Sequence, residues 1–202
     1  MINENSGIYV EGYIKIHNPE TKQIFVDKKN AIHYENMSIA LAESLGNSGQ
    51  GPISEMCFGN GGTNVDPTGI ITYLTPNSIG TNAGLYNQTF VKIVDDRNAN
   101  NTDPTRNKIE TRHVSGTNYS DILVTCLLDY GEPTGQDAFD TASSQDSLYV
   151  FDEIGLRSLG TSGQGSGRLL THVIFHPVQK SLNRLIQIDY TVRVQSLSGG
   201  NL

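Results

Sequence analysis

One stretch near the C-terminus constrains the fold more than any other part of the sequence. From Ser181 to Gln195 the chain reads SLNRLIQIDYTVRVQ, and apolar residues alternate with polar ones from Ile186 to Val194. Successive side chains of a β-strand point to opposite faces, so this alternation places all the apolar side chains on one face. A strand with one apolar and one polar face is typical of an antiparallel sandwich or barrel.

Composition limits the class of protein in which such a sheet occurs. The 202 residues fit one all-β domain, and we expect a single β-sandwich domain over residues 1–202. The net charge is −7 and the 14 basic residues form no run, so the sequence lacks the electrostatic signature of nucleic-acid binding. No stretch approaches the roughly 18 apolar residues of a transmembrane helix, and the N-terminus does not resemble a signal peptide.

The N-terminal third is expected to form a hairpin followed by the one convincing helix. Residues 8–17 predict a strand, Asn18–Lys22 carries turn residues, and residues 23–27 return as the second arm. Asn30 is a candidate N-cap for a helix over residues 31–45. Four residues at helical spacing are expected to form its buried stripe: Tyr34, Met37, Leu41 and Leu45.

Other apolar or alternating segments predict the remaining strands, and long polar segments separate them. We expect a mainly β fold, an antiparallel and jelly-roll-like sandwich with one helix in its N-terminal half. A turn is expected near Pro177–Asn183. The strands are expected at residues 53–58, 88–95, 108–114, 119–129, 148–156, 169–175 and in the final alternating stretch, and the long loops at residues 59–87, 96–107, 131–147 and 157–167.

The longest of these loops carries the one candidate binding surface. Residues 59–87 are rich in Gly, Asn, Thr and Pro, yet they contain an apolar island. Because an exposed apolar patch on a soluble protein usually marks a partner surface, we expect this island to be an intersubunit contact. The alternative is that the island forms one more strand of the sandwich. The island consists of Ile70, Ile71, Tyr73 and Leu74.

No motif predicts catalysis, a cofactor or a metal site. His172 and His176 are four residues apart on an expected strand, which places them about 13 Å apart and too far to share a metal ion. The glycine-rich segment GNGGT at residues 59–63 lacks the GK[ST] of a phosphate loop. Its three glycines are instead expected to let the strand end turn through positive φ. Cys57 and Cys126 lie in apolar runs, which favours buried thiols over a disulfide.

Acidic residues offer a weaker candidate for metal binding. Asp95, Asp96, Asp146, Asp152 and Glu153 carry oxygens of the kind that Ca²⁺ accepts, but none has EF-hand spacing. Solvated acids in loops are the simpler interpretation. For Glu153, which interrupts an apolar strand, we expect exposure at a sheet edge rather than burial, with the apolar residues that follow it pointing inward.

Three short motifs carry a resemblance. KNAIH at residues 29–33 leads into the expected helix, ISEMCFGNGGT follows at residues 53–63, and FDEIGL stands at residues 151–156. This order resembles a loose class of tailed-phage virion proteins, found in neck, collar, baseplate and tail-fibre components. The resemblance spans residues 8–194 in outline. The chain departs from fibre components because it has no repetitive shaft and no receptor-binding tip, which favours a compact ring or attachment subunit.

The resemblance implies a non-enzymatic structural protein of a tailed-phage virion, assembled in the host cytoplasm and placed in the neck, collar or tail region. Its partners would be other virion proteins and further copies of itself, with no nucleic acid, membrane or cofactor. A capsid decoration subunit is the alternative within structural proteins. A jelly-roll carbohydrate-binding module is the alternative from another class, although the chain has no Trp and would need its nine tyrosines as aromatic platforms.

Overall fold

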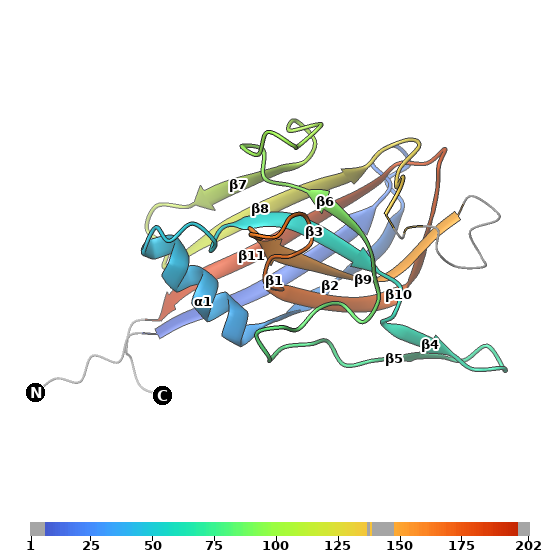
Figure 1. Ribbon diagram of the computed structural model, residues 1–202, viewed down its shortest axis with the longest axis horizontal. Helices are drawn as coiled ribbons and strands as arrows, with labels where there is room; N and C mark the ends of the chain where they lie inside the picture. The colour runs from blue at the N-terminus through green and yellow to red at the C-terminus, as the bar shows by residue number, and fades with distance from the viewer. Residues whose placement is uncertain (1–6, 137, 139–147, 198–202) are drawn as a thin grey trace, which may run out of the picture.

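A computed structural model describes residues 7–136, 138 and 148–197 of the chain. One helix and eleven strands occur in these residues (Figure 1). In chain order they are β1 (Gly7–His17), β2 (Ile24–Ile32), α1 (Tyr34–Leu45), β3 (Ile53–Gly59), β4 (Thr63–Val65), β5 (Ile71–Tyr73), β6 (Gln88–Ile93), β7 (Lys108–His113), β8 (Tyr119–Leu128), β9 (Leu148–Ser158), β10 (Thr171–Ser181) and β11 (Ile186–Leu197).

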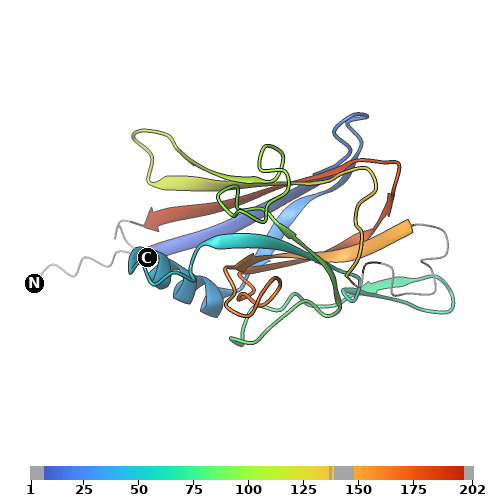
Figure 2. The ribbon, with the colours of Figure 1, turned by 45° about the horizontal axis from the view of Figure 1, so that its top comes forward.

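Nine of the strands form one continuous antiparallel sheet in the order β6-β3-β9-β10-β2-β1-β11-β8-β7. The sheet curls so that β6, β3, β9 and β10 make one layer and β1, β11, β8 and β7 make the other, as the two ribbon views show (Figures 1 and 2). The expected mainly β, sandwich-like fold is confirmed. The two layers belong to one curled sheet, and β2 joins them.

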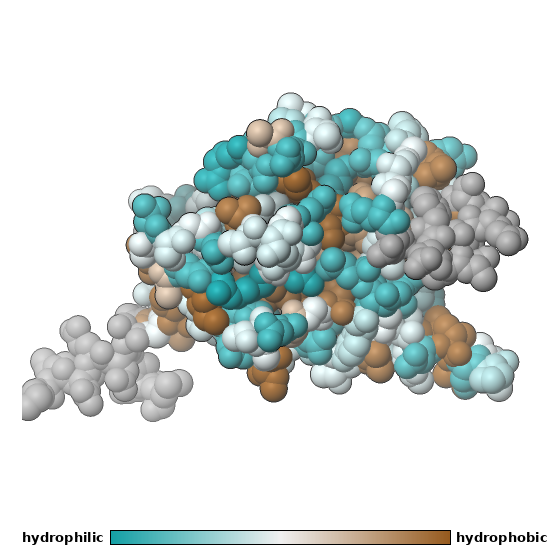
Figure 3. All heavy atoms as spheres, viewed as in Figure 1, coloured by the Kyte–Doolittle hydropathy of each residue, from teal (hydrophilic) through white to brown (hydrophobic). Residues whose placement is uncertain are grey.

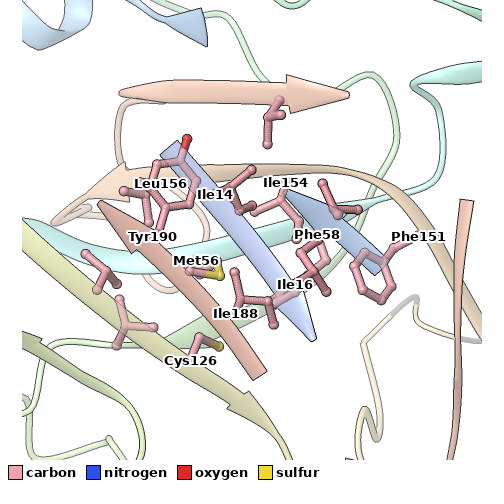
Figure 4. Close-up of a cluster of buried hydrophobic side chains, with 14 of the residues drawn as sticks. Ile14, Ile16, Met56, Phe58, Cys126, Phe151, Ile154, Leu156, Ile188 and Tyr190 are labelled. Atoms are coloured by element: carbon pink, nitrogen blue, oxygen red, sulfur yellow. The ribbon is translucent and has the colours of Figure 1, made fainter. Parts of the chain in front are cut away.

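The core lies between the two layers. Figure 4 shows side chains of β1, β8 and β11 facing those of β3 and β9, and all of the labelled residues are buried. In β11 the expected alternation is confirmed, because every second side chain from Ile186 to Val192 is buried while the residues between are partly exposed. Ile154 and Leu156 of β9 are fully buried, as expected.

The helix is shorter than the sequence predicts. It begins at Tyr34, and the side chain of His33 rather than Asn30 caps it by accepting a hydrogen bond from the Asn36 amide. Residues 31 and 32 belong to β2 instead, because they pair with β10 and their backbone groups are satisfied there. The expected stripe is only partly right, since Tyr34 and Leu45 are exposed. The residues that the helix buries are Asn36, Met37 and Ala40.

Strand β10 is longer than expected. The turn expected near Pro177–Asn183 lies only at the end of that range, at residues 182–183, because β10 continues through Pro177 to Ser181. Pairing with β9 shifts register between Ile174 and Val178, and this irregularity accommodates a proline that cannot donate to the ladder. Among the described residues, no helix is long and apolar enough to cross a membrane.

Candidate functional site

The expected 59–87 loop contains a small two-stranded hairpin that is separate from the nine-stranded sheet. Strands β4 and β5 pair only with each other, from Thr63 opposite Tyr73 to Val65 opposite Ile71. Ile71 and Tyr73 of the apolar island therefore lie in a strand that does not belong to the sandwich, and Ile70 and Leu74 flank it. The hairpin lies beside β10, and β4 contacts that strand (Figures 1 and 2). We refer to residues 59–87 as the arm.

Two consecutive acids on β9 face the arm. Phe151 and Ile154 both belong to the core, although they are three residues apart in a strand. Strict alternation would put them on opposite faces, so the two residues between them, Asp152 and Glu153, are both turned away from the core. Each of them accepts hydrogen bonds from the arm.

Glu153 joins both ends of the arm to the sandwich. One carboxylate oxygen accepts from the amides of Gly61, at 3.1 Å, and Asn87, at 2.8 Å. The other accepts from the Tyr86 amide at 3.0 Å and from Nε2 of His172 at 2.9 Å. The side chains of Glu153 and His172 are both 0 % exposed. The expected edge exposure of Glu153 is therefore wrong, because the arm covers this face of β9.

The neighbouring groups complete the anchor. Asp152 accepts from the amides of Gly62 and Thr63 at 2.9 and 3.0 Å, and from the Thr63 hydroxyl. His172 accepts from the Asn77 amide through Nδ1 at 2.8 Å, so its Nε2 carries the proton that Glu153 receives as a hydrogen bond. We call Asp152, Glu153 and His172 the anchor.

Burial and hydrogen bonding act in opposite directions on the two carboxylates. Burial alone raises the pKa of Glu153, but the hydrogen bonds from His172 and from the two amides at the end of the arm outweigh it and hold this pKa below its usual value. For Asp152 burial prevails over the hydrogen bonds from Gly62 and Thr63, and its pKa is raised. Glu153 therefore holds the arm as a carboxylate.

The glycines at the start of the arm allow the close approach that the anchor needs. The expectation of positive φ at residues 59, 61 and 62 is wrong, because none of them has it. A Cβ on Gly59 would instead lie 2.5 Å from Glu153 Oε1, and a Cβ on Gly62 would lie 2.9 Å from Cγ2 of Ile174. Side chains at these positions would push the arm off the sheet.

The second half of the arm is also attached to the start of the helix. The Tyr34 amide donates to the Ser78 carbonyl at 3.2 Å, and Glu35 accepts from the Gly80 amide at 2.9 Å. The Tyr86 ring lies 5.7 Å from the His172 ring, and its hydroxyl donates to the Thr75 carbonyl. Both halves of the arm are thus fixed at their bases.

The hairpin, in contrast, exposes apolar side chains. Ile70 is 62 % exposed and Tyr73 is 54 % exposed, and Val65 of β4, which lies outside the predicted island, is 62 % exposed. Ile71 and Leu74 are half-buried. Figure 3 shows hydrophobic surface in the region of the hairpin. Beside it lies a cavity of about 350 Å³ between the hairpin and the sandwich, with lining residues that include Phe25, Tyr73, Leu74, Pro76 and Phe175.

The remaining candidates do not gather into a reactive site. In the described residues no group of three His, Cys, Asp or Glu side chains is placed to hold a metal ion. Asp146 lies outside these residues, and Asp95 pairs with Arg97. Both cysteines are free and fully buried, and burial raises the pKa of Cys57 to about 11 and that of Cys126 to about 12.

The anchor resembles a catalytic dyad only in composition. Its His and Glu side chains are inaccessible to solvent, and the arm and β9 already occupy their hydrogen-bonding atoms. Their geometry holds a segment in place. Comparisons of the chain with protein-family models, with curated proteins and with solved structures found no match.

Proposed function

We propose that this protein is a non-enzymatic structural component of a tailed-phage virion, a ring or attachment subunit of the neck, collar or tail region, and that it assembles with further copies of itself through the arm. The curled sheet serves as a rigid body. The hairpin at residues 63–73 reaches the neighbouring subunit. The observation that carries this proposal is an arm with fixed bases and an exposed apolar hairpin.

The three motifs that carry the resemblance pack together in the fold. Strand β3, from the second motif, pairs with β9, from the third, so that Gly59 stands opposite Glu153. The Gly61 amide then donates to the same carboxylate. His33, from the first motif, donates its amide to the Leu170 carbonyl just before β10. Motifs more than 100 residues apart in the sequence thus belong to one packed unit around the base of the arm.

The two edges of the sheet favour assembly through the arm over assembly by strand addition. On the edge strand β6, the Gln136 side-chain amide accepts from the Val91 amide at 2.8 Å and donates to its carbonyl at 3.0 Å, as a neighbouring strand would. The other edge strand, β7, carries Lys108, Glu110 and Arg112. Capped or charged edges resist pairing with another chain.

The oligomeric state of a hairpin variant tests the proposal. We expect the chain to form an oligomer in solution, with a mass at least twice the 22.0 kDa of one chain when it is measured by light scattering. Ile70→Lys should shift this mass toward the monomer, because a charge at the centre of an apolar contact has to be buried without a partner. The thermal transition of the variant should stay close to that of the wild type, since Ile70 is exposed.

Val114→Lys is the matched control, because Val114 is 55 % exposed and follows β7 in the other layer. This substitution should leave the mass unchanged. A monomeric wild-type chain, or equal effects of the two substitutions, would rule out the hairpin as the contact between subunits.

A further inference from the structure

A second feature lies away from the hairpin, between helix α1 and the loop that follows β9. These two segments lie side by side in both ribbon views (Figures 1 and 2). They enclose a cavity of about 530 Å³, which residues 81–83 of the arm close on a third side. This volume falls within the range of small-molecule sites. Neither the anchor nor the hairpin contributes a residue to it.

Arg157 forms part of the wall of this cavity and is only 9 % exposed. Its Nε donates to Gln88 Oε1 at 3.0 Å, and its Nη1 donates to the Gly167 carbonyl at 2.6 Å. These two bonds fix the guanidinium plane. Nη2 makes no hydrogen bond to an oxygen atom of the described residues. It lies against residue 84, where an added Cβ would be 3.3 Å from it, and the guanidinium also interacts with the buried thiol of Cys57. Of the three guanidinium nitrogens, only Nη2 has no oxygen acceptor among the described residues.

Within the described residues, Arg157 forms no ion pair at contact distance, although the Glu55 carboxylate is near enough to interact with its charge. Two arginines and no acidic residue line the cavity, in a chain whose net charge is −7. The second, Arg168, is already paired, because its Nη1 lies 3.0 Å from both carboxylate oxygens of Glu43. Buried charges are normally paired, so an unpaired guanidinium at a cavity favours binding of an anion.

The rest of the wall is mainly polar and contains no aromatic residue, although Ile39, Ala83 and Leu159 also line it. Four of its side chains make no hydrogen bond with the described residues, and their hydroxyl and amide groups are free to donate and accept. Such groups match a ligand with several hydroxyls. They are Gln50, Thr81, Asn82 and Thr161.

We propose that this cavity is a binding site for an acidic sugar, with Arg157 receiving the carboxylate of the sugar and the four free polar side chains receiving its hydroxyls. A subunit on the surface of a particle would then carry a saccharide site separate from its assembly contact. The site does not depend on the proposed virion role, because none of its residues belongs to the hairpin.

Titration calorimetry of the complete chain with galacturonate, galactose and inorganic phosphate tests this site. We expect galacturonate to bind and galactose, which has the hydroxyls without the carboxylate, to bind at least about tenfold more weakly, since a charge-assisted hydrogen bond is lost. Phosphate should also bind more weakly than galacturonate, because it makes no use of the hydroxyl-binding groups. If galactose bound with the same affinity as galacturonate, Arg157 would have no role in binding. If phosphate bound with the same affinity as galacturonate, the cavity would be an anion site that does not recognise a sugar.

Variants locate the binding. Arg157→Gln should lower the affinity for galacturonate at least about tenfold. Arg112→Gln removes the same charge from exposed strand β7 and should have no effect. Thr161→Trp fills the cavity from an exposed position and should abolish binding in a folded protein, which keeps the test decisive if Arg157→Gln unfolds. No binding by the wild type, or unchanged binding by Thr161→Trp, would overturn the proposal.

Discussion

Strands β9 and β11 have similar lengths and inward faces but different outward faces. In β11 the outward residues are partly exposed, and its acid, Asp189, has a side chain that is 42 % exposed. In β9 nearly every residue is buried, and the outward acid Glu153 is 0 % exposed. The two acids also have different partners, because Asp189 bonds to side chains and Glu153 bonds mainly to backbone amides of the arm.

The difference shows what covers each layer. The layer containing β11 has a solvated outer face, as expected for a strictly alternating strand. The layer containing β9 is covered on its outside by the arm and by the loop after β9, so its outward polar residues must find protein partners. A polar residue in a strand therefore does not by itself indicate an exposed face.

The two strands should differ most in the loss of stability that follows when the outward acid is removed from each. Glu153→Ala should lower the free energy of unfolding by about 3–5 kcal/mol, because it leaves three amides and a histidine buried without an acceptor. Asp189→Ala should cost about 1 kcal/mol or less, since water replaces its partners. Urea unfolding of both variants gives the two values. Similar costs would mean that the arm does not cover β9.

The inward faces of the two strands should behave alike. Ile188 of β11 and Ile154 of β9 are both fully buried in the same core. We expect Ile188→Ala and Ile154→Ala each to cost about 2–5 kcal/mol in chemical denaturation, the usual range for truncating a buried aliphatic side chain. A small cost at Ile188 alone would indicate that the register of β11 is wrong by one residue.

The two anchor carboxylates should make opposite contributions to the pH dependence of stability in acid. The folded-state pKa of Glu153 lies below 4.5, so the stabilisation from its ionised form is present above that pH and is lost as the pH falls through the folded-state pKa. Burial raises the pKa of Asp152 above 3.8, so protonation of Asp152 favours the fold and opposes part of this loss.

We therefore expect Glu153→Gln to lose less stability on acidification than the wild type, and Asp152→Asn to lose more. Unfolding curves at a series of pH values below neutrality compare the three proteins. Identical pH dependence for all three would show that neither carboxylate is perturbed by the fold.

The sequence predicts the solvated layer better than the covered one. The alternation of β11 specifies both its strand and its facing, because one side meets the core and the other meets water. The burial of Glu153 depends on an arm that ends more than 60 residues earlier in the chain, and no local pattern encodes that contact. The adjacent acids between Phe151 and Ile154, together with the glycines of residues 59–62, were the available signal.

The start of the helix and the cavity are two further features that a local sequence pattern does not predict. Asn30 is a good N-cap by residue type, but pairing of Ala31 and Ile32 with β10 overrides this local preference. Arg157 lies within a strand, and only the approach of α1 and of residues 81–83 turns its surroundings into a cavity. Pairwise contacts between distant segments decide both features.

Hydrogen exchange of individual amides in the complete wild-type chain tests most directly whether the arm is fixed at its bases and free at its hairpin. The amides of Gly61, Tyr86 and Asn87, which donate to Glu153, should exchange only through global unfolding. The amides of residues 66 and 68–70 at the hairpin tip should exchange much faster through local opening. Exchange of the three Glu153-bound amides at the rate of the tip would contradict the anchored arm and, with it, the proposed basis of assembly.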